Sequence, residues 1–290
     1  MRISGKTRLL GVIGNPIGHS LSPVMHNAAL EEMGSDFVYV AFSIEESVLS
    51  IAVAGFGAIG VQGFSVTIPH KQAIMAELVH ISELATAVGA VNTVWKIAQG
   101  WSGTNTDVEG FVSPLQEMNR DWSEENAIVL GNGGAARAVV VGCAELGFKS
   151  IQVIGRDSNK LQDFLASFNS FESVASRLTV NTWDTLDNAI VNANLIVNST
   201  PIGMAPNVDA SPLTTMQSQK IKAGTIAYDL IYTPNPTEFL RQAQAQGAIA
   251  IDGLEMLVQQ GAAALKIWTG KSEVPVTTMR VALQRHLGLV

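Results

Sequence analysis

The sequence predicts an α/β protein built on two open, mostly parallel sheets. Short apolar runs alternate with helix-like segments along the chain, which is typical of strand–helix–strand units. A glycine-rich turn at residues 131–137 stands between an apolar run and a helical segment. The chain has 290 residues, of which 47% are hydrophobic and 15% charged. That is enough for two domains with a large core.

The first half is expected to contain three strands and a hairpin at a sheet edge, separated by helices. The strands are predicted at residues 9–13, 37–42 and 63–68, and the hairpin joins residues 90–97 to a short partner around Trp101. The helices are predicted at residues 23–33, 45–55, 70–79 and 82–88. Ser22 before Pro23 predicts the N-cap of the first helix, because serine and proline favour these two positions.

The second half repeats the alternation after a boundary near residues 107–110 and a linking helix at 110–118. Its strands are predicted at residues 127–130, 151–154, 177–180, 195–198, 225–229 and 248–251. Its helices are predicted at residues 138–146, 158–168, 185–191, 237–246, 256–268 and 275–286.

The glycine-rich turn fits the G-x-G-x-x-G/A pattern of a dinucleotide-binding unit, because it follows a strand and opens a helix. Gly131 allows the tight turn, Gly133 lets the backbone approach a pyrophosphate, and Ala136 is small enough for the helix to pack on the strand. The second half is therefore predicted to be a doubly wound Rossmann domain. The alternative is that the glycine-rich segment forms only a turn and binds no ligand.

Composition excludes several classes of protein. The net charge of -7 argues against nucleic-acid binding, which needs a basic face. No apolar run is long enough to span a bilayer, and the N-terminus lacks the layout of a signal peptide. Cys143 is the only cysteine, which fits a reducing cytoplasm. No cysteine or histidine cluster indicates a metal. We expect a cytoplasmic protein, monomeric or homodimeric, that binds a small molecule and neither nucleic acid nor membrane.

Polar residues gather at predicted strand ends, where open α/β sheets bind ligands. Ser20 and Ser22 lie beside a predicted helix N-terminus, which suits a carboxylate ligand, although Ser22 could simply cap the helix. Lys71 is expected at the start of a helix, where the dipole disfavours a cation, so a function is indicated. A solvated surface lysine is the usual alternative. His70 is expected to be exposed or to cap. Residues 89–93 and 103–107 combine small and amide side chains, which turn chemistry alone would explain.

Together these stretches resemble the shikimate dehydrogenase family. The matching segments are residues 14–23, 63–71, 89–93, 105–107, 131–137, 198–204, 228–232 and 252–260. They follow the order of that family and cover nearly the whole chain. The resemblance implies a substrate-binding and catalytic domain at residues 1–108, completed by helices in 253–290, and a Rossmann NADP-binding domain at 109–252. It also implies the reversible reduction of 3-dehydroshikimate to shikimate by NADPH, a step of aromatic amino-acid biosynthesis.

The resemblance also assigns roles to individual residues. Lys71 and Asp107 would be the catalytic pair, and Ser20 and Ser22 would hold the substrate carboxylate. Other contacts to substrate hydroxyls or to the carboxylate would come from Thr67, Asn92, Asp107, Tyr232 and Gln260. Leu230 and Gly253 would lie beside the nicotinamide. The full set of cofactor-binding residues would be Glu83, Gly131, Asn132, Gly133, Gly134, Ala135, Gly155, Arg156, Asp157, Thr200, Leu230 and Gly253.

One departure from the family pattern bears on the cofactor. The family commonly has Asn-Arg-Thr after the second Rossmann strand, and this chain has Gly155-Arg156-Asp157. Arg156 suits the 2′-phosphate of NADP, whereas Asp157 could repel that phosphate or bind the ribose hydroxyls of NAD. NADP is favoured.

Three alternatives stay open at the level of sequence. The first is a quinate/shikimate dehydrogenase that uses NAD or both cofactors, although the pair Ser20 and Ser22 favours shikimate. The second is a regulator that binds the nucleotide without chemistry, which would usually lack Lys71 and Asp107. The third is a Rossmann domain with an unrelated partner domain, against which the motifs before residue 108 argue.

Overall fold

The computed structural model describes residues 3–290 and divides into two compact units. The N-terminal unit contains the residues up to Gly110 together with Val258–Val290. The Rossmann unit contains Phe111–Leu257. Two helices cross the boundaries between them, α4 at Asp107–Gln116 and α11 at Gly253–Thr269. None of the helices in residues 3–290 has the length and apolar character needed to cross a bilayer.

The N-terminal unit is built on a six-stranded mixed sheet with the strand order β2-β1-β3-β5-β6-β4. Strands β1, β2 and β3 are parallel, and β5 is antiparallel to both β3 and β6. The predicted hairpin is confirmed, but the edge next to it is occupied by β4, which the sequence did not predict. The strands are β1 (Arg8–Gly14), β2 (Phe37–Ser43), β3 (Gly63–Val66), β4 (His80–Ile81), β5 (Thr93–Ile97) and β6 (Gly100–Thr104).

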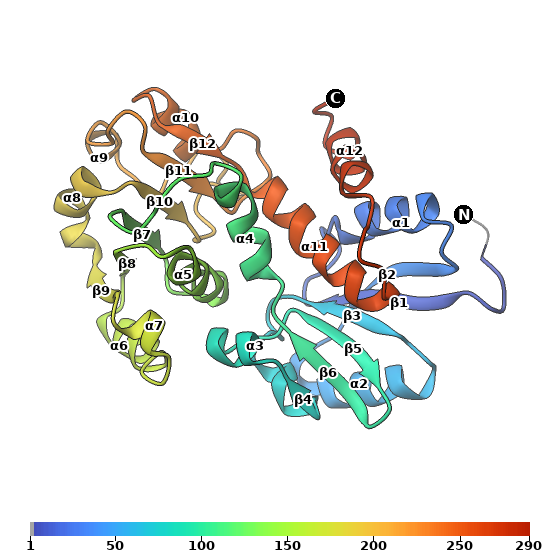
Figure 1. Cartoon of the computed structure of the whole chain (residues 1–290). Coiled ribbons are helices and arrows are strands. Elements are labelled where there is room, and N and C mark those ends of the chain that lie inside the picture. The colour runs from blue at the N-terminus through green and yellow to red at the C-terminus, as the bar shows by residue number, and fades with distance from the viewer. Residues whose placement is uncertain (1–2) are drawn as a thin grey trace. The chain divides into compact units, whose positions relative to one another are not determined.

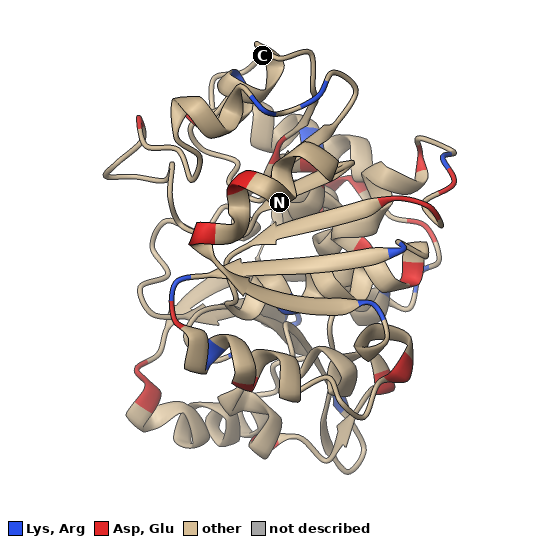
Figure 2. Ribbon diagram, turned by 90° about the vertical axis from the view of Figure 1, so that its left-hand side faces the viewer, with Lys and Arg blue, Asp and Glu red and all other residues tan. Residues whose placement is uncertain are grey.

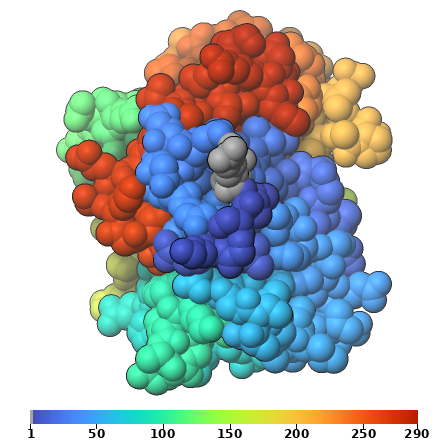
Figure 3. All heavy atoms as spheres, turned by 90° about the vertical axis from the view of Figure 1, so that its right-hand side faces the viewer, coloured from blue at the N-terminus to red at the C-terminus, as the bar shows by residue number. Residues whose placement is uncertain are grey.

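Helices cover both faces of this sheet, with α1, α11 and α12 on one side and α2 on the other (Figure 1). The C-terminal helix α12 packs against α1, so the last and the first helix of the chain lie side by side in this unit (Figure 3). The helices are α1 (Ser22–Glu32), α2 (Leu49–Ala58), α3 (Glu83–Val88) and α12 (Val276–His286), with 3₁₀ turns at Glu46–Val48 and Ala73–Glu77.

Helix α11 completes the core of the N-terminal unit through Trp268. The Trp268 indole donates a hydrogen bond to the carbonyl of Val94, 2.9 Å away. A Cβ at Gly63 would lie 2.3 Å from this ring, so the glycine makes room for it. Trp268 thus packs on strand β3. The polar segment that carries Thr67 and Lys71 follows this strand directly.

The predicted helix at residues 70–79 is wrong. Residues 68–72 form turns, and only Ala73–Glu77 is helical, as a 3₁₀ helix. Long-range hydrogen bonds hold this backbone at the end of β1. The Thr67 amide donates to Ile13, and the Ile68 carbonyl accepts from Asn15. Lys71 therefore lies in a turn, and the argument from the helix dipole does not apply to it.

The Rossmann unit is built on a six-stranded sheet in which every pair of neighbours is parallel. From β9 to β12 the strand order is β9-β8-β7-β10-β11-β12, the doubly wound order 3-2-1-4-5-6. The strands are β7 (Asn126–Leu130), β8 (Ser150–Gly155), β9 (Leu178–Thr182), β10 (Leu195–Asn198), β11 (Ile226–Asp229) and β12 (Ile249–Ile251). The predicted fold class is confirmed.

Charged residues are nearly absent from the strands and lie mainly on helices and at strand ends (Figure 2). In the Rossmann sheet the single charged strand residue is Asp229, at the end of β11. Most residues of the central strands β7, β10 and β11 are apolar, as expected for a parallel sheet.

The helices of the Rossmann unit are α5 (Gly134–Leu146), α6 (Ser158–Ala166), α7 (Glu172–Ala175), α8 (Leu186–Ala189), α9 (Thr215–Ser218) and α10 (Glu238–Gln244). The sequence did not predict the four-residue helices α7 and α9. Helix α9 has a capping box made by Thr214 and Gln217, and this local pattern could have revealed it.

Candidate active site

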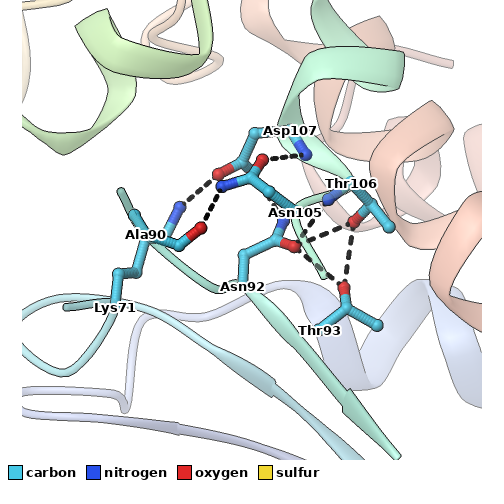
Figure 4. A network of polar contacts seen from close by, with 7 residues as sticks. All are labelled: Lys71, Ala90, Asn92, Thr93, Asn105, Thr106 and Asp107. Atoms are coloured by element: carbon cyan, nitrogen blue, oxygen red, sulfur yellow. Dashed lines mark hydrogen bonds and ion pairs between the residues drawn. The ribbon is translucent and has the colours of Figure 1, made fainter. Parts of the chain in front are cut away.

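Lys71 and Asp107 form a close ion pair in the N-terminal unit. The Lys71 ammonium donates to Oδ2 of Asp107 across 2.6 Å, and the two side chains are 20% and 10% exposed. Lys71 comes from the turn after β3 and Asp107 begins α4 (Figure 4). The pairing brings together two residues that are 36 positions apart in the chain.

Asn92 supports the carboxylate of Asp107 from its other side. The Asn92 amide donates to Oδ1 of Asp107 across 2.8 Å, and the carbonyl oxygen of the same side chain accepts from the backbone amide of Thr106. Both oxygens of Asp107 are therefore hydrogen-bonded, one by Lys71 and one by Asn92.

The surrounding polar residues are almost fully buried and fix this arrangement (Figure 4). The Asn105 side chain donates to the carbonyl of Ala90 and accepts from the amide of Asp107. Thr93 donates to Oδ1 of Asn92. Such a satisfied buried network is rigid, because each member constrains its neighbours. The turn residues at 89–93 and 103–107 thus assemble one site, which turn chemistry alone would not require.

Helix α1 differs from the prediction at its first turn. The helix begins at Ser22, and its N-cap is Leu21, which makes no side-chain capping bond. Ser22 is therefore not the cap, because it is already the first helical residue. The Ser20 hydroxyl accepts a hydrogen bond from the Ser22 amide at 3.4 Å.

His70 anchors the turn that carries Thr67 and Lys71. It is fully buried, and its Nε2 donates to the carbonyl of Ile44 across 2.7 Å. The expectation that His70 is exposed or caps a helix is wrong, because the segment folds back onto the chain that follows β2. Thr67 is half-buried at the same end of the sheet, with its methyl group against Gly14.

The remaining predicted substrate residues are distributed over both units. Gln260 lies half-buried on α11 in the N-terminal unit. Tyr232 belongs to the Rossmann unit, where burial raises the pKa of its phenol, so the group stays a hydrogen-bond donor.

The glycine-rich turn lies at the switch point of the Rossmann sheet, between β7 and β10. Gly131 has a φ of +100°, which favours glycine, and a Cβ there would come within 3.0 Å of both Ser199 and Thr200. The structure therefore brings the predicted cofactor residue Thr200 to the turn. Added Cβ atoms at Gly133 and Gly134 would meet nothing within 4 Å, which leaves space for a ligand at the start of α5.

This space fits a dinucleotide. Helix α5 has 13 residues, and its N-cap Gly133 makes no side-chain capping bond, so backbone amides there remain for a pyrophosphate. The N-cap is followed at once by Gly134 and Ala135, and Ala136 is fully buried against the core. A Cβ at Gly155 would lie 3.4 Å from the side chain of Asn132, so these two predicted cofactor residues are neighbours.

Asp157 is the N-cap of α6. Its carboxylate accepts hydrogen bonds from the backbone amides of Asn159 and Lys160, at 3.0 and 3.2 Å. Arg156 precedes it and is exposed. Asp157 therefore has a structural partner in its own helix, and Arg156 is the exposed cation next to it that fits a 2′-phosphate.

Leu230 and Gly253 also lie together. A Cβ at Gly253 would come within 2.2 Å of the Leu230 carbonyl, so the glycine permits this close approach of two backbones. Asp229, just before them, is fully buried and accepts from Asn198 and Thr237. Burial raises the pKa of Asp229 to about 6. Glu83 lies apart from this group in sequence and unit, exposed in the first turn of α3.

Sequence reasoning assigned no role to Tyr39, Ser65 or Asn105. Tyr39 and Ser65 share a buried hydrogen bond of 2.8 Å. The available signal was a tyrosine among apolar residues of a strand, because a buried phenol needs a hydrogen-bond partner. Among residues 3–290, no group of three or more histidine, cysteine, aspartate or glutamate side chains is arranged to hold a metal ion.

Two protein-family models match this chain, one in each half. Residues 12–94 match the shikimate dehydrogenase substrate binding domain, and residues 253–284 match the shikimate 5′-dehydrogenase C-terminal domain. A curated relative, the shikimate dehydrogenase (NADP(+)) of Trichormus variabilis, is 59% identical over 289 residues, with 99% of this chain and 100% of the relative covered.

Solved structures agree over nearly the full length. A shikimate dehydrogenase in complex with NADP+ superposes with a TM-score of 0.90 at 36% identity, covering 99% of this chain and 98% of that chain. The shikimate 5-dehydrogenase of Thermus thermophilus in complex with NADP(H) and shikimate gives a TM-score of 0.83 at 33% identity, covering 96% of this chain and 99% of that chain.

Proposed function

The chain belongs to the shikimate dehydrogenase family, and we propose that Lys71 and Asp107 are the acid–base pair of its reaction. The enzyme is an NADP-dependent oxidoreductase that reversibly reduces 3-dehydroshikimate to shikimate, a step of the shikimate pathway. The observation that carries the proposal is the 2.6 Å contact between the Lys71 ammonium and the Asp107 carboxylate, in a nearly buried polar network.

Lys71 is the member of the pair suited to carry the proton. Both oxygens of Asp107 already accept hydrogen bonds, whereas the contact with Asp107 uses one of the three donors of the Lys71 ammonium. In the reduction Lys71 donates a proton to the substrate carbonyl oxygen, and in the oxidation the neutral amine accepts it from the hydroxyl. Asp107 orients the ammonium and binds a substrate hydroxyl.

The other polar residues of the N-terminal unit position the substrate. Ser20 and Ser22, beside the first turn of α1, donate to its carboxylate. Thr67, Asn92 and Gln260 hold its hydroxyls or carboxylate. Positioning of this kind supplies much of the rate of hydride-transfer enzymes, because the protein itself moves only one proton.

The Rossmann unit holds NADP. The glycine turn and the N-terminus of α5 hold the pyrophosphate through Gly131, Asn132, Gly133, Gly134 and Ala135. Arg156 holds the 2′-phosphate. Thr200, Leu230 and Gly253 line the remainder of the site, together with Gly155 and Asp157. When bound, the nicotinamide supplies the hydride in one direction and accepts it in the other.

Substitution of Lys71 tests the acid–base pair. Lys71→Ala is expected to lower kcat by about 10²- to 10⁴-fold, the usual contribution of a positioned acid–base group, with a much smaller change in the KM for shikimate. The measurement is steady-state absorbance of NADPH in the direction of shikimate oxidation.

Lys220→Ala is the matched control. Lys220 forms an ion pair with Asp187 at the same distance of 2.6 Å, but both side chains are more exposed and lie in the Rossmann unit. This variant should keep the activity of the parent enzyme. A kcat for Lys71→Ala within a few-fold of that of Lys220→Ala would refute the proposed role.

The proposal also includes the location of the enzyme in the cell and its oligomeric state. We infer a cytoplasmic enzyme, because Cys143 is the only cysteine and a single cysteine forms no internal disulfide. We also infer a monomer or homodimer, which light scattering of the purified protein would distinguish from a larger assembly.

A further inference from the structure

Asn105 joins two segments of the N-terminal unit that hold the proposed catalytic pair. Its Nδ2 donates to the carbonyl of Ala90 across 3.0 Å, and its Oδ1 accepts from the backbone amide of Asp107 across 3.0 Å (Figure 4). Ala90 lies in the connection between α3 and β5, residues 89–92, and Asp107 begins α4. Asn105 is 2% exposed, so its two hydrogen bonds are shielded from water.

The 89–92 connection also holds the backbone of Lys71. The amide of Val91 donates to the carbonyl of Lys71 across 2.8 Å. Val91 follows Ala90 directly, so the bond to Lys71 lies one residue away from the bond to Asn105. Asn105 therefore links the backbone of Asp107, through Ala90 and Val91, to the backbone of Lys71.

The same connection holds the side chain of Asp107. Asn92 donates to Oδ1 of Asp107 across 2.8 Å. One short segment thus contacts Lys71 through the backbone of Val91 and Asp107 through the side chain of Asn92. A displacement of this segment from residues 105–107 would disturb both contacts, and the bond from Asn105 to Ala90 opposes that displacement.

An amide side chain fits this position because its two partners are of opposite kinds. The carbonyl of Ala90 needs a donor and the amide of Asp107 needs an acceptor, so only one orientation of the Asn105 amide satisfies both. A serine hydroxyl at position 105 can accept from the amide two residues on, as in local turns. Its shorter side chain does not reach Ala90 at the same time.

We propose that Asn105 is a positioning residue that sets the spacing between Lys71 and Asp107. A role in the local turn accounts for the bond to Asp107, two residues away, but not for the bond to Ala90, 15 positions away. The ion pair of 2.6 Å then forms between two side chains whose backbones are already held in place. Such preorganisation matters because small errors in the placement of reacting groups are costly to the rate.

The inference rests on the proposed function, in which Lys71 and Asp107 are the acid–base pair. The first variant is Asn105→Ala, which removes both hydrogen bonds. It should lower kcat by about 10- to 100-fold, as expected for a displaced catalytic group, and leave the KM for NADP unchanged. The measurement is steady-state absorbance of NADPH in the direction of shikimate oxidation. A kcat within about threefold of that of the parent enzyme would overturn the inference.

Asn105→Ser separates positioning from a role in the local turn. Serine keeps an acceptor for the amide of Asp107 and loses the bond to Ala90. Its kcat should therefore fall at least tenfold. If Asn105→Ser instead stays within about threefold of the parent enzyme, the local turn is sufficient and the inference is overturned. This variant alone carries the test, with the same two outcomes, if circular dichroism shows that Asn105→Ala does not fold.

The Lys71→Ala background separates positioning of the pair from general damage. Once the ammonium is absent, its spacing from Asp107 no longer affects proton transfer. Adding Asn105→Ala to Lys71→Ala should therefore change the residual kcat by less than about threefold, because residues that act together are not additive. A further loss as large as that in the parent background would show that Asn105 acts independently of Lys71, and would overturn the inference.

Asn126→Ala is the matched control. The Asn126 side chain also joins two segments, because it donates to the carbonyl of Asn192 and accepts from the hydroxyl of Ser150. It begins β7, at the opposite end of this strand from the glycine turn. Its loss should leave kcat unchanged. A fall in kcat equal to that of Asn105→Ala would show that the loss of any bridging amide damages the enzyme, and would overturn the inference.

Lys71→Ala by itself distinguishes failure of the inference from failure of the proposed function. If Lys71→Ala keeps a kcat near that of the parent enzyme, the acid–base pair is wrong, and the role of Asn105 falls with it. If Lys71→Ala lowers kcat as expected while Asn105→Ala and Asn105→Ser do not, the pair stands and only the role of Asn105 is overturned.

Discussion

Asp157 shows how a single residue changes meaning once its partners are known. From the sequence, its carboxylate could repel the 2′-phosphate of NADP or bind the ribose of NAD. In the structure it accepts from the amides of Asn159 and Lys160 at the start of α6. Aspartate is among the best N-cap residues. The helix cap therefore explains Asp157 without a role in choosing NAD, and Arg156 remains the group that fits the 2′-phosphate.

Asp157→Asn should separate the charge of this residue from its capping role. Asparagine caps helices as well as aspartate but carries no charge. The KM for NADP should fall by up to about fivefold, as expected for removing one exposed like charge near the phosphate, with the KM for NAD unchanged. The measurement is steady-state kinetics with saturating shikimate.

Asp157→Ala is the companion variant, because it removes the charge and the cap together. It should show the same change in the KM for NADP but should also lose about 0.5–2 kcal/mol of unfolding free energy in urea. An unchanged KM for NADP in both variants would mean that the carboxylate lies too far from the phosphate to matter.

At the scale of elements, residues 67–71 show a local pattern overridden by tertiary contacts. The segment was predicted to continue from a strand into a helix, yet it forms turns held by bonds to the end of β1 and by His70. These contacts join residues far apart in the chain. The result is a fixed turn that places Lys71 beside Asp107. A regular helix starting at His70 would not require these long-range contacts.

His70→Phe should loosen this turn. The variant removes the donor to Ile44 and leaves a buried carbonyl unpaired, which costs about 1–3 kcal/mol of unfolding free energy. We also expect kcat to fall severalfold, because Lys71 is the next residue. His70→Gln, which can place an amide donor where Nε2 lies, should restore part of both. Thermal unfolding and steady-state kinetics provide the two readouts, and a normal kcat for His70→Phe would argue against an anchoring role.

At the scale of the whole molecule, each unit carries a buried group whose pKa is shifted, and the two shifts have opposite directions. In the N-terminal unit, burial lowers the pKa of His26 to about 3. In the Rossmann unit, burial raises the pKa of Asp229 to about 6. Each group favours its neutral form when folded, because each lies in a poorly solvated core. The two units should therefore respond differently to acid.

Acidification from pH 7 to pH 5 should destabilise the N-terminal unit through His26. Unfolded histidine binds a proton near pH 6.5, whereas folded His26 stays neutral down to about pH 3. Its contribution to stability is thus complete above pH 6.5 and is lost as the pH falls below that value. At pH 5 the loss is about 2 kcal/mol.

For Asp229, the effect of acid on stability has the opposite sign. Its folded pKa lies above the unfolded value of 3.8, so the folded Rossmann unit binds more protons between these values and gains stability as the pH falls from 6. Hydrogen-exchange protection factors, corrected for intrinsic exchange, should fall in α1 and β2 and not in β10 and β11. His26→Phe should remove the first effect, and an unchanged pH response in that variant would contradict the assignment.

The sequence by itself determined the features that depend on neighbours in the chain. The alternation of apolar runs and helices predicted two α/β halves, and the turn at Gly131 predicted a Rossmann fold for the second half. These predictions hold because periodicity and glycine conformation act over a few residues. The resemblance to a known family supplied the roles of Lys71 and Asp107, which no local pattern could assign.

The tertiary structure alone decided which side chains meet. It paired Lys71 with Asp107 across 36 residues, buried His70 against Ile44 and placed Trp268 on strand β3. Each of these contacts depends on strand order and register, which bring distant segments to one edge of a sheet. Because those are set by packing of the whole core, no window of sequence contains them.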